Sequence, residues 1–199
     1  MGKLDLNDVV FAICEGEGGV ISGRTRLQKI AYFVTHLLSE DMAVDPGFVA
    51  HYYGPYSSAL STVAASVVAR GVIEESTEVF ASGPFLGHDM EQKRYSYSLT
   101  PRGRVARDLR QQRAAAAYTR AVEIARKIDQ TGADYRVLSY AAKVHYVLRQ
   151  EGKPVTQHAI RRHARTLGWE LTPDEMTAGV ELLSQLELVT EGDSEEANP

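Results

Sequence analysis

Apolar residues recur every three or four positions in the first part of the chain, the spacing that lines one face of an α-helix. The first stripe predicts a helix over about 5–15 and consists of Leu6, Val9, Val10, Ile13 and Cys14. A second stripe predicts a helix that begins near residue 24 and consists of Leu27, Ile30, Ala31, Val34 and Leu38. A third helix is expected over 58–70, because a serine can cap its start and Gly71 stops it.

The pattern then changes to the alternation of a β-strand. Tyr95, Tyr97 and Leu99 alternate with polar residues, which predicts a two-stranded hairpin formed by about 72–80 and 93–99. Residues 20–23 can add a short extended segment. Thr100-Pro101, a cap followed by proline, predicts one long helix to about residue 128 that runs through four consecutive alanines, 114–117.

Three further helices are expected after residue 131, near 137–148, over 156–167 and from Thr172-Pro173 onward. The predicted fold class is therefore mainly α with a small β-hairpin wing. It comprises a winged helix-turn-helix domain with a long C-terminal helix (1–130), a three-helix, winged-helix-like domain (131–192) and a disordered tail (193–199).

The composition indicates the class of protein and the compartment in which we expect it. Hydrophobic residues make up 44% and charged residues 24% of the 199, which is typical of a globular protein. No apolar run approaches the roughly 20 residues that cross a bilayer, and the N-terminus lacks the pattern of a signal peptide. With one cysteine, Cys14, predicted to be buried, we expect a cytoplasmic protein without a membrane partner.

Charge is unevenly distributed along the chain. Residues 1–91 carry 5 Lys/Arg against 12 Asp/Glu, residues 92–165 carry 17 against 5, and residues 166–199 carry none against 9. A central block of +12 favours a polyanionic partner. The alternative is that these cations pair in space with the acidic ends.

Candidate nucleic-acid contacts follow from the expected docking of a winged helix, whose third helix enters the major groove. They are Arg24, Arg26 and Lys29 near the start of the second helix, Ser58, Ser61 and Thr62 on the third helix, and Lys93 and Arg94 on the wing. The outer face of the third helix, made of Ser58, Ser61, Thr62, Ala65 and Ala69, offers no Arg, Asn or Gln for base recognition. The wing tip, 82–90, has no Lys or Arg. A smooth face of small residues suits protein packing at least as well.

A second basic group lies in the C-terminal part. His158, Arg161, Arg162 and Arg165 share one face of the expected helix over 156–167. This stripe can contact phosphate or pair with Asp174 and Glu175 on the next helix, and pairing is slightly favoured.

The aromatic segment 48–56 contains a Gly54-Pro55 turn, and we call it the aromatic turn. It allows two interpretations. It can form a stacking platform, or its rings can pack beneath the turn, and packing is the favoured interpretation. The six histidines do not show the spacing of a zinc site, and no nucleophile–base motif is present. We therefore expect no enzyme activity, metal or cofactor.

Two family resemblances support the fold. Gly71-Val72-Ile73-Glu74 and the later segment 93–103 resemble the wing and exit of MarR- and PadR-type repressors. The segment 23–32, followed by Tyr53-Gly54-Pro55-Tyr56-Ser57, looks like a family of largely uncharacterised bacterial and archaeal winged-helix proteins, including the Panacea antitoxin-like domain. The resemblance covers about 5–110 and implies a winged helix with a DNA-binding or antitoxin-like role.

Two functional hypotheses remain open. The first is a dimeric transcriptional regulator or antitoxin-like autoregulator that binds duplex DNA, with a toxin as an alternative partner. The second is a non-enzymatic adaptor that binds a protein partner through the aromatic turn and the smooth third helix.

Overall fold

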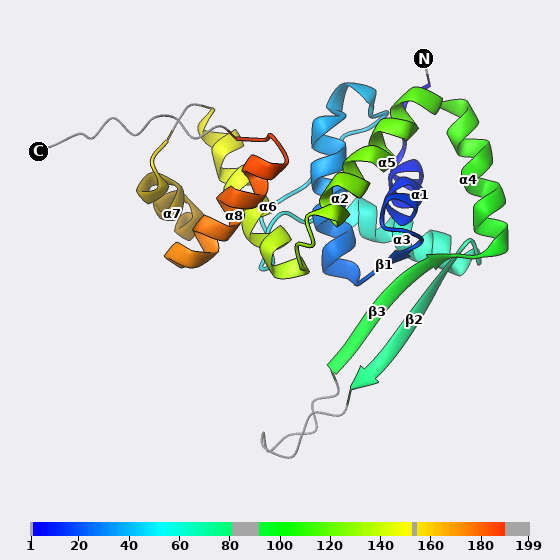
Figure 1. Cartoon of the computed structure of the whole chain (residues 1–199), viewed down its shortest axis with the longest axis horizontal. Helices are drawn as coiled ribbons and strands as arrows, with labels where there is room; N and C mark the ends of the chain where they lie inside the picture. Colours follow the sequence, from blue (N-terminus) through cyan, green and yellow to red (C-terminus); the bar gives the residue numbers. More distant parts are fainter. Residues whose placement is uncertain (1, 81–91, 153–154, 190–199) are drawn as a thin grey trace, which may run out of the picture.

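The computed structural model describes residues 2–80, 92–152 and 155–189. It is mainly helical with one small antiparallel sheet, which confirms the predicted fold class. We call α1–α5 the N-terminal unit and α6–α8 the C-terminal unit. Figure 1 shows the two units side by side, with the β2–β3 hairpin projecting away from the helices.

The N-terminal unit has the element order of a winged helix. It contains α1 (Leu6–Gly16), β1 (Val20–Ile21), α2 (Arg24–Leu37), a short 3₁₀ turn η1 (Ser39–Asp41), α3 (Ser58–Ala69), β2 (Ile73–Phe80) and β3 (Gln92–Leu99). Strands β2 and β3 pair in antiparallel register from Ile73 opposite Leu99 to Phe80 opposite Gln92, so the predicted hairpin is confirmed. The short β1 pairs with the other edge of β3, which makes the sheet three-stranded.

The prediction of a single helix over 101–128 is wrong. The chain forms α4 (Pro101–Arg113) and α5 (Ala115–Gln130), which are separated at Ala114 with φ −139° and ψ 47°. Ala114 is buried, and the N-terminal segment packs against the break so closely that a Cβ on Gly2 would lie 2.3 Å from the Arg113 carbonyl oxygen. Tertiary contacts here override the helix propensity of the alanine run.

The C-terminal unit contains α6 (Tyr135–Glu151), α7 (Gln157–Thr166) and α8 (Pro173–Gln185), close to the predicted helices. Asp134, Thr156 and Thr172 cap the three helices with their side chains. Helix α8 packs on α6, and a Cβ on Gly179 would meet the backbone of Tyr140 and Ala141 at 3.0–3.1 Å. The predicted tail beyond residue 192 lies outside the described residues.

Helix α2 lies at the centre of the molecule, between α1 and α6. Every residue from Arg26 to Thr35 is buried, so this helix has no solvent face over almost three turns. The hydrophobic core continues from the N-terminal unit across α2 into the C-terminal unit. Burial of polar side chains on such a helix requires a partner for each of them.

Candidate docking groove and interunit cleft

Arg24 is the exposed member of the three predicted cations on α2. Its guanidinium lies 2.5 Å from a Glu75 carboxylate oxygen, donates to the Tyr97 hydroxyl at 3.1 Å, and stacks 3.9 Å from the centre of the Tyr95 ring. The hydrogen bond from Arg24 to Glu75 raises the pKa of Arg24. These contacts join the start of α2 to the hairpin. The charge of Arg24 is thereby paired within the protein.

Arg26 lies inside the protein, contrary to the exposed position expected from the sequence. Its guanidinium binds Glu17 at the end of α1, donates to the Ala133 carbonyl oxygen at 2.6 Å, and lies 3.3 Å from Asp129. It thus holds together the end of α1, the end of α5 and the connection to the C-terminal unit. Its burial leaves it no surface on which to meet a DNA phosphate.

Lys29 is also buried, with 1% of its surface exposed, where the sequence indicated an accessible cation. Its Nζ donates to the Pro55 carbonyl oxygen at 2.6 Å, beneath the aromatic turn. Burial and the nearby Lys143 lower the pKa of Lys29 to about 7. The hydrogen bond from Lys29 thus connects α2 to the turn.

The hydroxyl groups of α3 are largely engaged within the protein. Ser61 Oγ accepts a hydrogen bond of 2.9 Å from Gln28, and the Thr62 hydroxyl donates to the Ser58 carbonyl oxygen at 3.0 Å. Ser58 itself is exposed. Arg94 is exposed on β3, while the side chain of Lys93 and the wing tip lie outside what the structure describes.

The predicted pairing of the α7 stripe with α8 is wrong for the described residues. Arg161 instead donates to the Leu171 carbonyl oxygen at 3.0 Å. Arg162 and Arg165 are exposed and have no ion pair or hydrogen bond within the described part of the chain. Glu175 is used locally, because its carboxylate accepts the Thr172 backbone N–H at 2.9 Å and caps α8. His163 Nδ1 lies 2.6 Å from a Glu151 carboxylate oxygen.

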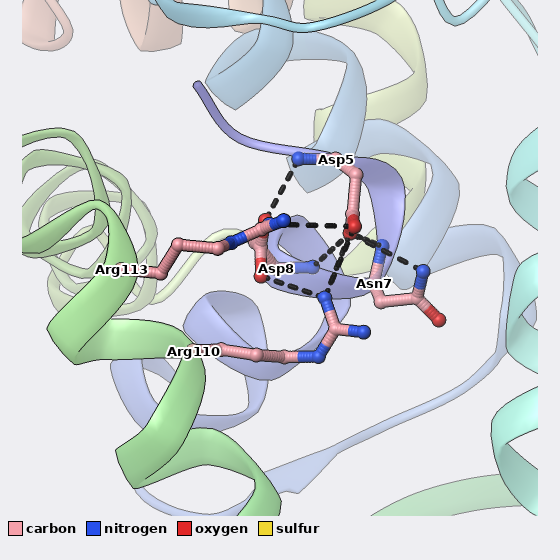
Figure 2. Close-up of polar contacts among 5 residues, drawn as sticks. All are labelled: Asp5, Asn7, Asp8, Arg110 and Arg113. Atoms are coloured by element: carbon pink, nitrogen blue, oxygen red, sulfur yellow. Dashed lines mark hydrogen bonds and ion pairs between the residues drawn. The ribbon is translucent and has the colours of Figure 1, made fainter. Parts of the chain in front are cut away.

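Two arginines in the last turn of the basic helix α4 pair with aspartates near the N-terminus. Figure 2 shows Arg110 and Arg113 converging on Asp5 and Asp8. Arg110 lies 2.8 Å from Asp8 and 3.0 Å from Asp5, and Arg113 lies 2.5 Å from Asp8, which is 1% exposed. Partial burial acts to raise the pKa of Asp5, but the Asp8 backbone N–H and Arg110 lower it overall.

The same pattern continues along α5. Arg120 pairs with Asp41 at 2.6 Å, and Lys127 pairs with Glu187 at 2.9 Å. Several cations of the central basic block therefore form ion pairs with acidic residues from both ends of the sequence. For these residues the arrangement matches the alternative that the charge pattern left open, in which the block pairs in space with the acidic flanks. Arg162 and Arg165 of the same block have no such pair among the described residues.

A groove of about 380 Å³ lies between the aromatic turn and α3, and we call it the α3 groove. Tyr53 and Tyr56 line one side and Ala64 and Ala65 line the other, with Arg24, Glu75 and Tyr97 at the hairpin end. The rings of His51 and Tyr56 pack with their centres 5.1 Å apart. Among its described lining residues, the groove combines small apolar side chains with aromatic rings and an internally paired cation.

A larger cleft of about 670 Å³ lies between the aromatic turn and the C-terminal unit, and we call it the interunit cleft. Tyr52 and Tyr53 line one wall, and Tyr135, Tyr140 and Trp169 come from the C-terminal unit. Trp169 fixes the two walls together, because its indole N–H donates to the His51 carbonyl oxygen at 2.7 Å.

The favoured interpretation of the aromatic segment, packing beneath the turn, holds for only part of it. Phe48 and Tyr56 are half-buried, but Tyr52 is 74% exposed and Tyr53 is 52% exposed. The wall formed by α6 and Trp169 was not predicted from the sequence. Tyr135, Tyr140 and Lys143 lie within the first half of α6. Their helical spacing alone does not show which face of the helix remains open to solvent.

A histidine cluster joins the two units on another side of α2. The Tyr32 hydroxyl and His145 Nδ1 share a hydrogen bond of 2.9 Å, and the rings of His36 and His145 lie 4.8 Å apart. Arg149 contacts the ring of His36. Burial, followed by the nearby His36 and Arg149, lowers the pKa of His145 to about 3, so its ring is neutral near neutral pH.

Metal-ligating side chains do not cluster in the described residues. No group of three or more His, Cys, Asp or Glu side chains within them is placed to hold a metal ion. Cys14 is fully buried, and burial raises the pKa of its thiol to about 12. No helix in the described ranges has the length and apolar character needed to cross a membrane.

Comparison with protein-family models found no match, and comparison with curated proteins found none either.

Proposed function

We propose that the protein is a non-enzymatic interaction module that docks a protein partner in the α3 groove. The observation that supports this most directly is the chemistry of the groove. The groove lies beside α3, the helix that a DNA-binding winged helix places in the major groove, and it presents Tyr53, Tyr56 and Ala65 beside Glu75. Exposed aromatic residues are enriched at protein interfaces, whereas duplex recognition requires accessible cations and bidentate base readers.

The charge arrangement supports the same proposal. Arg24 is paired with Glu75, Arg26 and Lys29 are buried, and Arg110 and Arg113 are paired with the N-terminal aspartates. Counterion release from DNA needs cations that can reach phosphates. Most of the cations predicted on the N-terminal unit are committed to contacts inside the protein.

The test uses the full-length chain with a photoreactive amino acid at Ala65, and a matched probe at exposed Ser184 on α8 as control. We expect a defined cross-linked protein partner with the first probe and none with the second. Ala65→Arg should abolish retention of that partner, while Ser184→Arg should preserve it. Cross-linking of the same partner from both positions would contradict docking in the groove.

A DNA-binding regulator, with an antitoxin-like autoregulator as its variant, is the second candidate. It is favoured by the winged-helix element order and by Arg162 and Arg165, which have no partner within the described residues. A dimer with about three phosphate contacts per subunit should then show a slope of log affinity against log salt near −5. We expect instead no duplex binding at about 50 mM salt. A steep slope that flattens on replacing Arg162 and Arg165 would overturn the adaptor proposal.

A further inference from the structure

The interunit cleft has a different chemistry from the α3 groove. Three tyrosines expose their rings along it, with Tyr52 74%, Tyr53 52% and Tyr135 42% exposed. Core packing does not explain exposed tyrosine rings in the same cleft, because an apolar surface stabilises the fold only when it is removed from water. Its volume of about 670 Å³ lies within the range of small-molecule sites, which form preferentially between structural units.

Among the described residues that line the cleft, the cations Arg136, Lys143 and Arg165 outnumber the acids Glu170 and Glu175. Arg165 has no partner within the described residues, and Lys143 lies half-buried with its Nζ 5.9 Å from the centre of the Trp169 ring. Glu175 is held by the backbone of Thr172 and by the Tyr140 hydroxyl. Glu170 is exposed at the rim. The cleft therefore presents positive charge beside open aromatic rings.

A peptide ligand fits this arrangement less well. The described walls come from the aromatic turn, α6, the end of α7 and the start of α8, so no sheet edge is available for strand addition. A continuous apolar stripe, as required to dock an amphipathic helix, is also missing from the described walls because charged residues interrupt them. Planar rings beside cations are the features that bind a nucleobase and its phosphate.

We propose that the interunit cleft binds a nucleotide unit, whose base stacks on Tyr52 and whose phosphate contacts Lys143 and Arg165. The unit can be a free nucleotide or part of a single strand, because the two share this chemistry. Burial lowers the pKa of Lys143, and a bound phosphate would offset that effect by stabilising the charged form. The cleft shares Tyr53 with the α3 groove, but Tyr52 and Arg165 line only the cleft and Ala65 lines only the groove, so variants at these positions test the two proposals separately.

The test is calorimetric titration of the full-length protein with AMP, adenosine, inorganic phosphate and a thymidylate pentamer. We expect binding of AMP or the pentamer, with adenosine and phosphate each much weaker. Tighter binding of the pentamer identifies a single strand as the source, and binding of AMP alone identifies a free nucleotide. Quenching of Trp169, the single tryptophan of the chain, gives an independent readout from the cleft wall.

Two exposed variants locate the site. Arg165→Gln and Tyr52→Leu should each weaken binding by about tenfold, the effect of losing a phosphate contact or a stacking ring. Arg162→Gln on the same helix and Val49→Ala on the same loop lie outside the cleft and should leave affinity unchanged. The proposal is overturned if no probe binds, if the cleft variants bind like the wild type, or if the control variants lose as much affinity. Binding of an acidic peptide without any nucleotide would also overturn it.

Discussion

Buried His145 predicts that the fold loses stability in mild acid. In the unfolded chain this histidine has an ordinary pKa of 6.5, whereas in the folded protein burial lowers the pKa to about 3. Between these values the unfolded chain binds a proton that the folded protein does not bind, so stability falls as the pH decreases below 6.5. Above 6.5 both states are neutral at this residue, and its contribution no longer changes with pH.

The magnitude follows from the 1.5 pH units between 6.5 and 5. Each unit contributes about 1.4 kcal/mol, so His145 alone should lower the free energy of unfolding by about 2 kcal/mol between about pH 7 and pH 5. For a chain of this size, that corresponds to a decrease in Tm of about 4–8 °C. His36 acts in the same direction, because burial and then Arg149 lower its pKa as well.

Thermal unfolding followed by circular dichroism at the two pH values measures this effect. His145→Gln removes the titrating group and can retain a hydrogen bond to Tyr32 through its side-chain amide. Its Tm should therefore change by about 4–8 °C less than that of the wild type between the two pH values. His158→Gln on α7 is the matched control, since that histidine is exposed, and it should behave like the wild type. An unchanged pH dependence in His145→Gln would refute the reasoning.

Three further predictions concern stability and reactivity. Asp8→Asn should lower the free energy of unfolding by about 2 kcal/mol in urea titration, because it removes the buried charge that holds Arg110 and Arg113; the exposed control Asp108→Asn should change it by less than about 0.5 kcal/mol. Gly103→Ala should cost about 2 kcal/mol or more in the same assay, since its Cβ would meet the Val72 carbonyl oxygen at 1.9 Å; a neutral result would show that α4 can shift away from the hairpin. Cys14, whose thiol pKa is about 12, should react with a thiol reagent only after addition of denaturant, and rapid labelling of the native protein would contradict its burial.

Most of the secondary structure was predictable because local signals agreed with the tertiary packing. Thr100-Pro101, Thr172-Pro173 and the alternation from Tyr95 to Leu99 each mark an element that the structure contains. The break at Ala114 was not predictable from such signals. It depends on contacts with the N-terminal segment that are distant in sequence, and the alanines themselves favour a helix.

The candidate site was predictable only in part. The aromatic turn and the small residues of α3 are contiguous in sequence, and both line the α3 groove. The burial of Lys29 was missed because helical periodicity places it at the edge of the apolar stripe, whereas α6 and the aromatic turn cover that edge in space. The wall containing Trp169 lies more than one hundred residues from the turn that it contacts, so no local pattern links them.

The buried guanidinium of Arg26 has a consequence for how this chain can be divided or inherited. It binds Glu17 and Asp129 in the N-terminal unit and the Ala133 carbonyl at the start of the C-terminal unit. Deleting everything after residue 130 would remove that carbonyl and also uncover Tyr32 on α2. We therefore expect that recombination could not exchange either unit alone, and that the two units are gained and lost together in evolution.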